Sequence, residues 1–285
     1  MCFKFFKKSC YRSNIHKLCP PTHLQKSASY SNINSTSSCS DIHKLNTLEL
    51  SFTNGMFYFN NNILKKDSNI AGKTSEIFTT QTNLIKRLYN KQQYENEKRN
   101  IEIICDQRCK YILQNVKFYD EFLIISMPKY DMDMFQYIEN NGYLRQNDAI
   151  QICMNIFMAL FYIHSKHLIY GDLKLENVCI NKNIREPILI DIGSCSKTNP
   201  TITLETASPE ALNYENLTYK HDIWTLGIFF MELTTSCKTI TTKVYKKEND
   251  FIDGQDKDIE MLKNNQLFTS CTNMDPTKRI CKFFS

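Results

Sequence analysis

Residues 170–177 read YGDLKLEN, a compact polar loop that contains Asp172, Lys174 and Asn177. A second carboxylate, Asp191, follows an apolar run and stands two residues before a glycine. Phosphoryl transfer requires groups of these kinds, because one carboxylate accepts a hydroxyl proton while an amide and another carboxylate hold magnesium. The stretch therefore predicts a phosphoryl-transfer site. The strength of this prediction depends on motifs elsewhere in the chain.

Asp191 distinguishes this pattern from an ordinary turn. A lone polar loop is more often turn chemistry than catalysis, because Asp and Asn bond readily to nearby backbone. Asp191, however, follows the residues PILI at 187–190, which have the composition of a buried strand. A charge at the end of a buried strand must be compensated by a cation or a metal. We therefore interpret Asp172, Asn177 and Asp191 together as functional.

Length, composition and charge are those of an ordinary soluble protein. The chain has 285 residues, of which 42% are hydrophobic and 23% charged, enough for one large domain or two small lobes. The net charge of +5 arises in residues 1–40, which carry six basic and no acidic side chains. The remainder is close to neutral, so we expect no nucleic-acid binding by the folded part.

Cysteine usage and hydropathy bear on the compartment. The twelve cysteines include no CxxC pair, so we expect free thiols inside a cell, in the cytoplasm or nucleus. No apolar run approaches the roughly 18 residues of a membrane span. Residues 1–45 lack periodicity and predict a disordered, solvated tail. The alternative for this tail is an acylated membrane contact through Cys2 and Cys10.

Hydrophobic patterning divides the rest of the chain into a strand-rich and a helix-rich part. Strands are expected within 48–59 around a turn at residues 54–55, continuing to 64, and at 70–77, 111–116 and 121–127. Helices are expected at 82–104, 134–139, 147–164 and 223–233. Five strands and one helix, followed by a mostly helical region, indicate a two-lobed α+β fold with its boundary near residues 128–130.

Five motifs in order give the chain a resemblance to eukaryotic-type protein kinases across roughly residues 48–282. They are YGDLKLEN at 170–177, DIG at 191–193, SPE at 208–210, DIWTLG at 222–227 and DPTKR at 275–279. In that family the fourth motif braces the catalytic loop, and the last one supplies Arg279 to pair with Glu210. The resemblance implies an N-lobe at 46–128 and a C-lobe at 129–285, truncated after Arg279. The chain is compact and divergent for this family, and in this respect it resembles the kinases of large DNA viruses.

The resemblance assigns roles to the loop residues. Asp172 would accept or orient the substrate hydroxyl, and Lys174 would neutralise the transferring phosphate. Asn177 and Asp191 would hold Mg²⁺ against the phosphates of ATP. A lysine two residues after the aspartate is the serine/threonine form of the loop. Thr203, seven residues before the glutamate of SPE, matches the threonine that contacts the catalytic aspartate.

The ATP-binding lysine has two candidates. IAGK at 70–73 resembles the family's V-A-x-K strand, in which Ala71 would stack on adenine and Lys73 would bind the α- and β-phosphates. Its helical partner would be Glu97, 24 residues later. The rival, Lys86, lies only 11 residues before Glu97, which leaves little chain for a strand end, a loop and a helix. Lys73 is preferred.

Residues 127–134, MPKYDMDM, resemble the segment that joins the two lobes in the family. Met127 would border the adenine pocket, and the backbone of Tyr130 would meet the adenine edge. An ordinary strand-to-helix connection would use the same geometry without a ligand.

Three departures from the family bear on activity. Residues 51–59 contain one glycine, Gly55, where the family typically uses three to bring backbone N–H groups to the phosphates. Gly171 replaces the arginine that reads a phosphate on the activation loop, so we expect no switching by loop phosphorylation. The segment 191–210 is also short, as in a constitutively ordered loop.

The expected function is that of a serine/threonine protein kinase that uses ATP and Mg²⁺ on a protein substrate, with the chain acting as a monomer. The alternative is a pseudokinase that binds or scaffolds, which the glycine-poor loop favours. The chain retains the residues of the family's phosphate, metal and catalytic contacts, which favours the enzyme: Lys73, Glu97, Asp172, Lys174, Asn177 and Asp191.

Overall fold

The computed structural model describes residues 50–279, apart from 55, 61, 67–74, 182–183, 214 and 240–250. By its internal contacts the chain divides into two compact units, residues 1–64 and residues 65–285. The second unit contains every predicted catalytic and metal-binding residue. The boundary expected between two lobes near residue 128 lies within this second unit.

The described part of the first unit is a three-stranded antiparallel sheet of β1 (Leu50–Thr53), β2 (Met56–Phe59) and β3 (Asn62–Ile63). Leu50 pairs with Phe59 and Thr53 with Met56, so a two-residue turn joins β1 to β2. Asn54 takes a φ of 52°, as such turns require. The expected strand–turn–strand is thus confirmed, and Gly55 lies outside the described residues. The second strand does not continue to residue 64, because the chain reverses at Asn60, with a φ of 48°.

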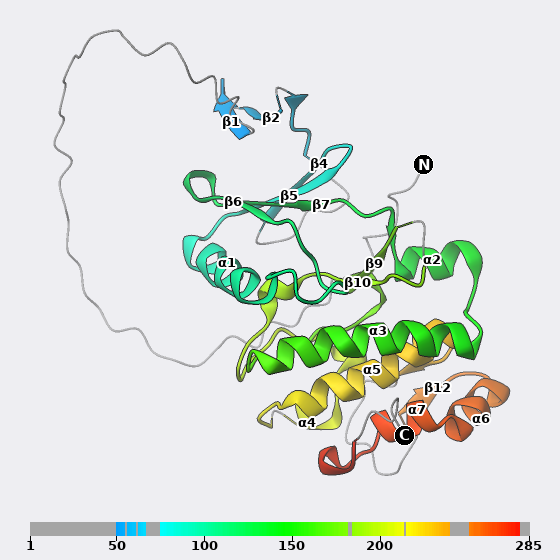
Figure 1. Cartoon of the computed structure of the whole chain (residues 1–285). Coiled ribbons are helices and arrows are strands. Elements are labelled where there is room, and N and C mark those ends of the chain that lie inside the picture. Colours follow the sequence, from blue (N-terminus) through cyan, green and yellow to red (C-terminus); the bar gives the residue numbers. More distant parts are fainter. Residues whose placement is uncertain are drawn as a thin grey trace, which may run out of the picture. The chain divides into compact units, whose positions relative to one another are not determined.

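The second unit begins with a four-stranded antiparallel sheet and one helix. The strands, in sheet order, are β4 (Ser75–Thr79), β5 (Asn83–Leu88), β7 (Ile124–Pro128) and β6 (Lys117–Tyr119). Helix α1 (Lys91–Ile104) lies along one face of this sheet (Figure 1). Ile85, Tyr94 and Ile104 are fully buried, which stabilises the helix on the sheet by the hydrophobic effect.

The helix expected at 82–104 is wrong in its first third. Residues 83–88 form β5, which pairs with β4 on one side and β7 on the other. Only two residues connect β5 to α1, and Asn90 caps the helix by accepting a hydrogen bond from the N–H of Gln93. The strand expected at 111–116 is wrong, because those residues form only an isolated bridge at Ile112 and β6 lies at 117–119 instead. The strand expected at 121–127 forms at 124–128, after the short helix η1 (Asp120–Phe122).

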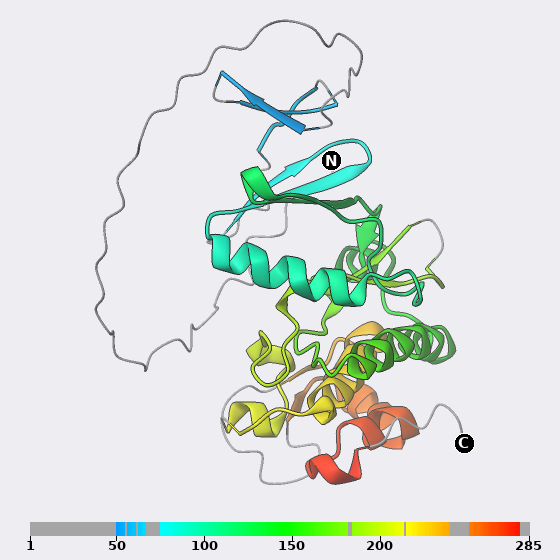
Figure 2. The same ribbon diagram turned by 60° about the vertical axis from the view of Figure 1, so that its left-hand side comes forward.

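The remainder of the second unit is mostly helical (Figures 1 and 2). Its α-helices are α2 (Met134–Asn141), α3 (Gln146–Ser165), α4 (Pro209–Leu212), α5 (Tyr219–Thr234), α6 (Asp256–Asn264) and α7 (Gln266–Cys271). The short strands are β8 (Met132–Asp133), β9 (Val178–Ile180), β10 (Ile188–Leu189), β11 (Lys238–Thr239) and β12 (Ile252–Asp253). Single 3₁₀ turns are η2 (Leu175–Asn177), η3 (Ile192–Ser194), η4 (Leu204–Thr206) and η5 (Pro276–Lys278).

Helix α5 is the centre of this helical region. It packs against α3 and α7, and Trp224, Phe229 and Phe230 on it are fully buried. Within the described ranges, no helix is both long enough and apolar enough to span a bilayer. None of the seven cysteines in those ranges forms a disulfide.

A buried ion pair ties the end of the described chain to α4. The guanidinium of Arg279 donates to both carboxylate oxygens of Glu210, at 2.6 and 2.8 Å, and lies over the Trp224 ring. Burial would raise the pKa of Glu210, but the hydrogen bonds and charge of Arg279 outweigh it and lower the pKa. The pairing expected from the SPE and DPTKR motifs is confirmed.

Breaking this pair should destabilise the fold. Arg279→Met keeps the side chain long but leaves the Glu210 carboxylate buried and unpaired, so the free energy of unfolding should fall by about 3–5 kcal/mol. Urea unfolding followed by circular dichroism measures it. The double variant Arg279→Met/Glu210→Leu should recover much of the loss. A loss below about 1 kcal/mol in the single variant would contradict a structural role for the pair.

Candidate active site

The loop at 170–177 is held by a buried carboxylate on α5. Asp222 accepts hydrogen bonds from the backbone N–H groups of Tyr170, at 2.9 Å, and Gly171, at 2.8 Å. His164, near the end of α3, contacts the same carboxylate at 2.7 Å. On the other side, Nε2 of His221 lies 3.0 Å from the carbonyl oxygen of Gly171. The bracing role expected of the DIWTLG motif is thereby visible in atomic contacts.

Asp172 stands at the centre of a hydrogen-bonded cluster. Its carboxylate accepts from Thr203 Oγ1 at 2.5 Å and lies 3.0 Å from Lys174 Nζ. Lys174 Nζ also donates to Thr203 Oγ1, at 2.8 Å. The side-chain amide of Asn177 donates to the backbone oxygen of Asp172 at 2.7 Å and to its carboxylate at 3.1 Å. The expected contact of Thr203 with the aspartate is confirmed, and Asp172, Lys174 and Asn177 lie together as predicted.

Asp191 is partly buried and takes a left-handed backbone conformation, with a φ of 53°. Burial raises the pKa of its carboxyl, because the charged form loses water. The positive charges of Lys86 and Lys174 oppose this rise. The negative charges of Glu97 and Asp172 add to it. A bound cation would stabilise the ionised form, so this site fits a metal ion.

The salt bridge on α1 corrects the expected lysine. Glu97 lies on α1, but it accepts a hydrogen bond from Lys86 Nζ on β5, at 2.6 Å. Eleven residues suffice because β5 ends at Leu88 and the helix begins at Lys91. The preference for Lys73 as the partner of Glu97 is therefore wrong; Lys73 lies outside the described residues.

Helix α1 is also fastened to the segment after Asp191. The amide of Asn100 donates to the backbone oxygens of Gly193, at 2.8 Å, and Cys195, at 2.7 Å. A Cβ at position 193 would lie 2.0 Å from Cγ of Glu97, so only glycine allows this approach. Glu97 and Asp191 are thus positioned by the same contact. Sequence reasoning missed Asn100.

The structure explains why position 171 is a glycine. Its φ is +85°, and a Cβ there would lie 2.4 Å from Pro200 Cβ and 2.7 Å from the backbone oxygen of Thr201. Ile169 forms two backbone hydrogen bonds with Ser196 nearby. The segment that carries Thr203 therefore packs directly on the catalytic loop.

The other predicted nucleotide contacts are described only in part. Met127, on β7, pairs with Leu84, and its side chain is partly buried. Tyr130 follows β7 and packs against the core, and burial raises its pKa. Ala71 lies outside the described residues.

Sequence comparison decides the family. The profile described as "Protein kinase domain" matches residues 69–282, three quarters of the chain. This chain belongs to the protein kinase family. The match begins after the β1–β3 sheet, so that sheet lies outside it. The α+β fold expected from the motifs is confirmed, with strands before helices.

Individual relatives are modestly similar. A "Serine/threonine-protein kinase US3 homolog" of Gallid herpesvirus 2 is 38% identical over 125 residues, which cover 40% of this chain and 30% of the relative. The homolog from Cercopithecine herpesvirus 9 is 25% identical over 169 residues (56% and 46%). "Serine/threonine-protein kinase 1" of Heliothis zea nuclear polyhedrosis virus is 31% identical over 138 residues (47% and 49%).

These matches confirm the expected similarity to kinases of large DNA viruses. The matched part of this kinase-family chain spans 30%, 46% and 49% of the lengths of these three relatives. The family assignment rests on the profile match over residues 69–282, and these partial matches agree with it.

One partly buried carboxylate near the Asp172 cluster escaped sequence reasoning. Glu232 lies in the last turn of α5, and among the described residues its Oε2 atom has no hydrogen-bond partner and no solvent contact. Burial raises its pKa to about 8, and the charges of Glu176 and Glu205 add to this rise. The signal was a single carboxylate in an otherwise apolar helical stretch.

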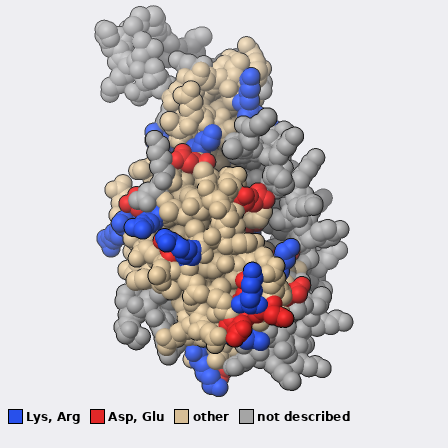
Figure 3. Space-filling view, turned by 90° about the vertical axis from the view of Figure 1, so that its right-hand side faces the viewer, with Lys and Arg blue, Asp and Glu red and all other residues tan. Residues whose placement is uncertain are grey.

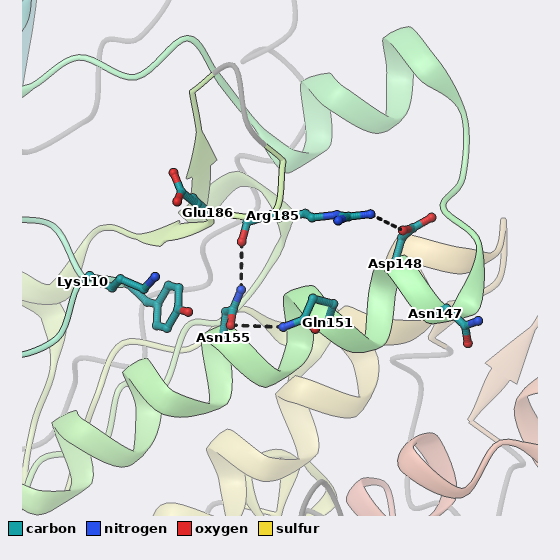
Figure 4. Close-up of a pocket in the computed structure, with 8 residues that line it drawn as sticks. Lys110, Asn147, Asp148, Gln151, Asn155, Arg185 and Glu186 are labelled. Carbon is teal, nitrogen blue, oxygen red and sulfur yellow. Dashed lines mark hydrogen bonds and ion pairs between the residues drawn. The ribbon is translucent and has the colours of Figure 1, made fainter.

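A separate surface pocket, of about 480 Å³, lies beside α3 (Figure 4). Asn155 donates to the backbone oxygen of Arg185 at 2.9 Å and lies 3.5 Å from Gln151. Arg185 is 4.0 Å from Asp148. The pocket shares no residue with the Asp172 cluster, and its polar groups largely satisfy one another.

Surface charge agrees with the expectation of a near-neutral folded part. On the face in Figure 3, basic and acidic side chains of the described residues interleave, and neither sign forms a continuous patch. This face therefore lacks the basic stripe typical of a nucleic-acid platform.

Glu232 should make stability depend on pH. Its folded pKa of about 8 lies above the ordinary 4.5, so the folded state binds the proton more tightly than the unfolded chain. Wild-type stability should therefore fall as the pH rises from about 5 to about 8.5, and Glu232→Gln should lose less over this range. Urea midpoints at both pH values measure the difference. The control is Glu260→Gln, at an exposed glutamate of α6; an equal slope in all three proteins would contradict the prediction.

Proposed function

We propose that this chain is a serine/threonine protein kinase that transfers the γ-phosphoryl group of ATP to a protein hydroxyl. The observation that carries the proposal is the cluster of Thr203 and Lys174 on the Asp172 carboxylate. Asp172 is 1% exposed, yet both of its oxygens are held in place. A fixed carboxylate can orient a substrate hydroxyl and accept its proton.

In this proposal the ammonium group of Lys174 neutralises negative charge on the transferring phosphate. Its ammonium is held 3.0 Å from Asp172 and 2.8 Å from Thr203, so its charge is placed where the hydroxyl meets the transferring phosphate. Preorganised charge of this kind stabilises the transition state without reorganisation. The contact of Thr203 with both groups supports serine/threonine over tyrosine specificity.

Asp191 and Asn177 would hold magnesium. The Asn177 amide nitrogen is used by Asp172, so the side-chain oxygen is the atom that would ligate the ion. Among the described residues no group of three or more His, Cys, Asp or Glu side chains could hold a metal, but Mg²⁺ needs only one or two protein ligands beside phosphate and water. When bound, the ion would neutralise negative charge on the phosphates.

Lys86 takes the place of Lys73 as the phosphate-binding lysine in this proposal. The side chain of Lys86 is 20% exposed and that of its partner Glu97 is 13% exposed, so their salt bridge is largely shielded from water. The positive charge of Lys86 also acts on Asp191, since it lowers the pKa of that partly buried carboxyl against the rise that burial causes. Met127 and Tyr130 would border the adenine. We further infer that the protein acts as a monomer in a reducing compartment, the cytoplasm or nucleus.

Phosphate transfer from labelled Mg²⁺–ATP tests the proposal. Asp172→Asn removes the acceptor carboxylate and should lower kcat by about 10²–10⁴-fold. Lys86→Met should lower kcat/KM by about 10²-fold, because the phosphates lose their positioning cation. Lys73→Met is the comparison and should stay within about threefold of wild type. Transfer that survives both Asp172→Asn and Asp191→Asn would overturn the proposal; magnesium-dependent ATP binding without transfer would indicate a pseudokinase.

The proposal includes an activation segment that needs no phosphate. Gly171→Ala should lower kcat by at least about tenfold, because the new Cβ would displace Pro200 and the segment bearing Thr203. Gly142→Ala is the matched control: its φ of +80° is similar, but a Cβ there meets nothing within 4 Å. Phosphatase treatment should leave wild-type activity unchanged. Loss of activity on dephosphorylation would contradict this part of the proposal.

A further inference from the structure

The side-chain amide of Asn100 donates two hydrogen bonds to one short turn. The turn is η3, which directly follows Asp191, and the acceptors are the backbone oxygens of Gly193, at 2.8 Å, and Cys195, at 2.7 Å. Carbonyl groups at the end of a helical turn lack partners within that turn. A primary amide carries two N–H donors, so one side chain satisfies both carbonyls.

Asn100 lies beside the partner of Lys86 on α1. Glu97 precedes Asn100 by three residues, so the two side chains are neighbours on the surface of the helix. Glu97 accepts from Lys86 Nζ at 2.6 Å, whereas Asn100 holds the turn after Asp191. A single turn of α1 therefore sets the position of the Lys86 ammonium relative to the Asp191 carboxyl.

Apolar packing alone would not fix this relation between α1 and η3. Ile101, which follows Asn100, is 2% exposed, and Ile192 in η3 is fully buried. Burial of this kind stabilises the contact but has no preferred direction. Hydrogen bonds do have one, and two of them from the same nitrogen define how η3 is turned against the helix.

We propose that Asn100 is a positioning residue for phosphoryl transfer: its two hydrogen bonds hold α1 and η3 in one register, so that Lys86 and Asp191 converge on the same phosphates and metal ion. The inference rests on the proposed kinase function. Asn100 itself touches neither substrate nor metal and acts through the backbone that carries Asp191. Because both acceptors are backbone oxygens, this arrangement needs no covalent modification of the chain.

A near-isosteric substitution tests the role of the amide. Asn100→Asp keeps the size of the side chain but replaces the donor with an oxygen that faces two carbonyl oxygens. It should lower kcat by at least about tenfold, through misplacement of Asp191 and Lys86. The Mg²⁺ concentration for half-maximal activity should rise by about tenfold, as for other groups that orient a metal ligand. The peptide KM should stay within about twofold, because no substrate contact is removed.

Two further variants separate hydrogen bonding from charge. Asn96→Asp makes the same change one turn earlier on α1, at an exposed side chain, and should stay within about twofold of wild type in kcat and Mg²⁺ requirement. Asn100→Leu removes the donors without adding a charge and should reproduce the defects of Asn100→Asp. An added carboxylate by itself would favour Mg²⁺, so a raised Mg²⁺ requirement is not explained by the new charge.

Hydrogen exchange and ADP titration give readouts that need no transfer. In Asn100→Asp, amides of residues 192–203 should exchange about tenfold faster, as expected from two lost hydrogen bonds, while the loop anchored by Asp222 keeps its protection. This result, with weaker binding of ADP in the presence of Mg²⁺, supports the inference even if no protein is phosphorylated and the kinase proposal fails. Unchanged exchange, or unchanged kcat and Mg²⁺ requirement in an active enzyme, overturns the inference and leaves the kinase proposal intact. Faster exchange throughout α3 and α5 would indicate general destabilisation and also overturns it.

Discussion

The Asp222 carboxylate is the contact on which the site depends. It is fully buried, and its two oxygens receive the backbone N–H groups of Tyr170 and Gly171. Two charge-assisted hydrogen bonds in a shielded interior fix a short loop more firmly than packing alone. Because Asp222 belongs to the most deeply buried helix, the loop inherits the rigidity of the core. His221, the preceding residue, holds the Gly171 carbonyl and Ser208, so the same turn of α5 also fixes the start of α4.

The sequence predicted the site correctly where the interacting residues belong to short motifs with fixed spacing. The cluster of Asp172, Lys174 and Asn177 lies within six residues, and a loop that brings them together needs little tertiary information. Arg279 and Glu210 are far apart in the chain, yet a motif containing each was recognisable, and the pair is present. Such residues have few alternatives that would satisfy a buried charge.

Sequence reasoning failed where pairing between strands decides the structure. Residues 83–88 space Leu84 and Leu88 as a helix would, but two neighbouring strands bond to this segment from both sides. Strand preference depends on those neighbours, which a local pattern does not contain. The misplaced helix made Lys86 look too close to Glu97. Glu232 was overlooked for the opposite reason, since its helix was recognised as buried and apolar and its one charge was ignored.

The shielded carboxylates of this chain fall into two kinds, those paired within the fold and those that burial leaves poorly compensated. Arg279 and Glu210 neutralise each other and serve the fold, whereas burial leaves Asp191 and Glu232 with raised pKa values. Folding tolerates such groups only when the surrounding structure overdetermines them. Asp191 is held by the contacts of α1 with Gly193, and Glu232 by the helix that anchors the catalytic loop. A nearby positive charge would stabilise the ionised form of either carboxylate, and the packing around each offsets the cost of burying it.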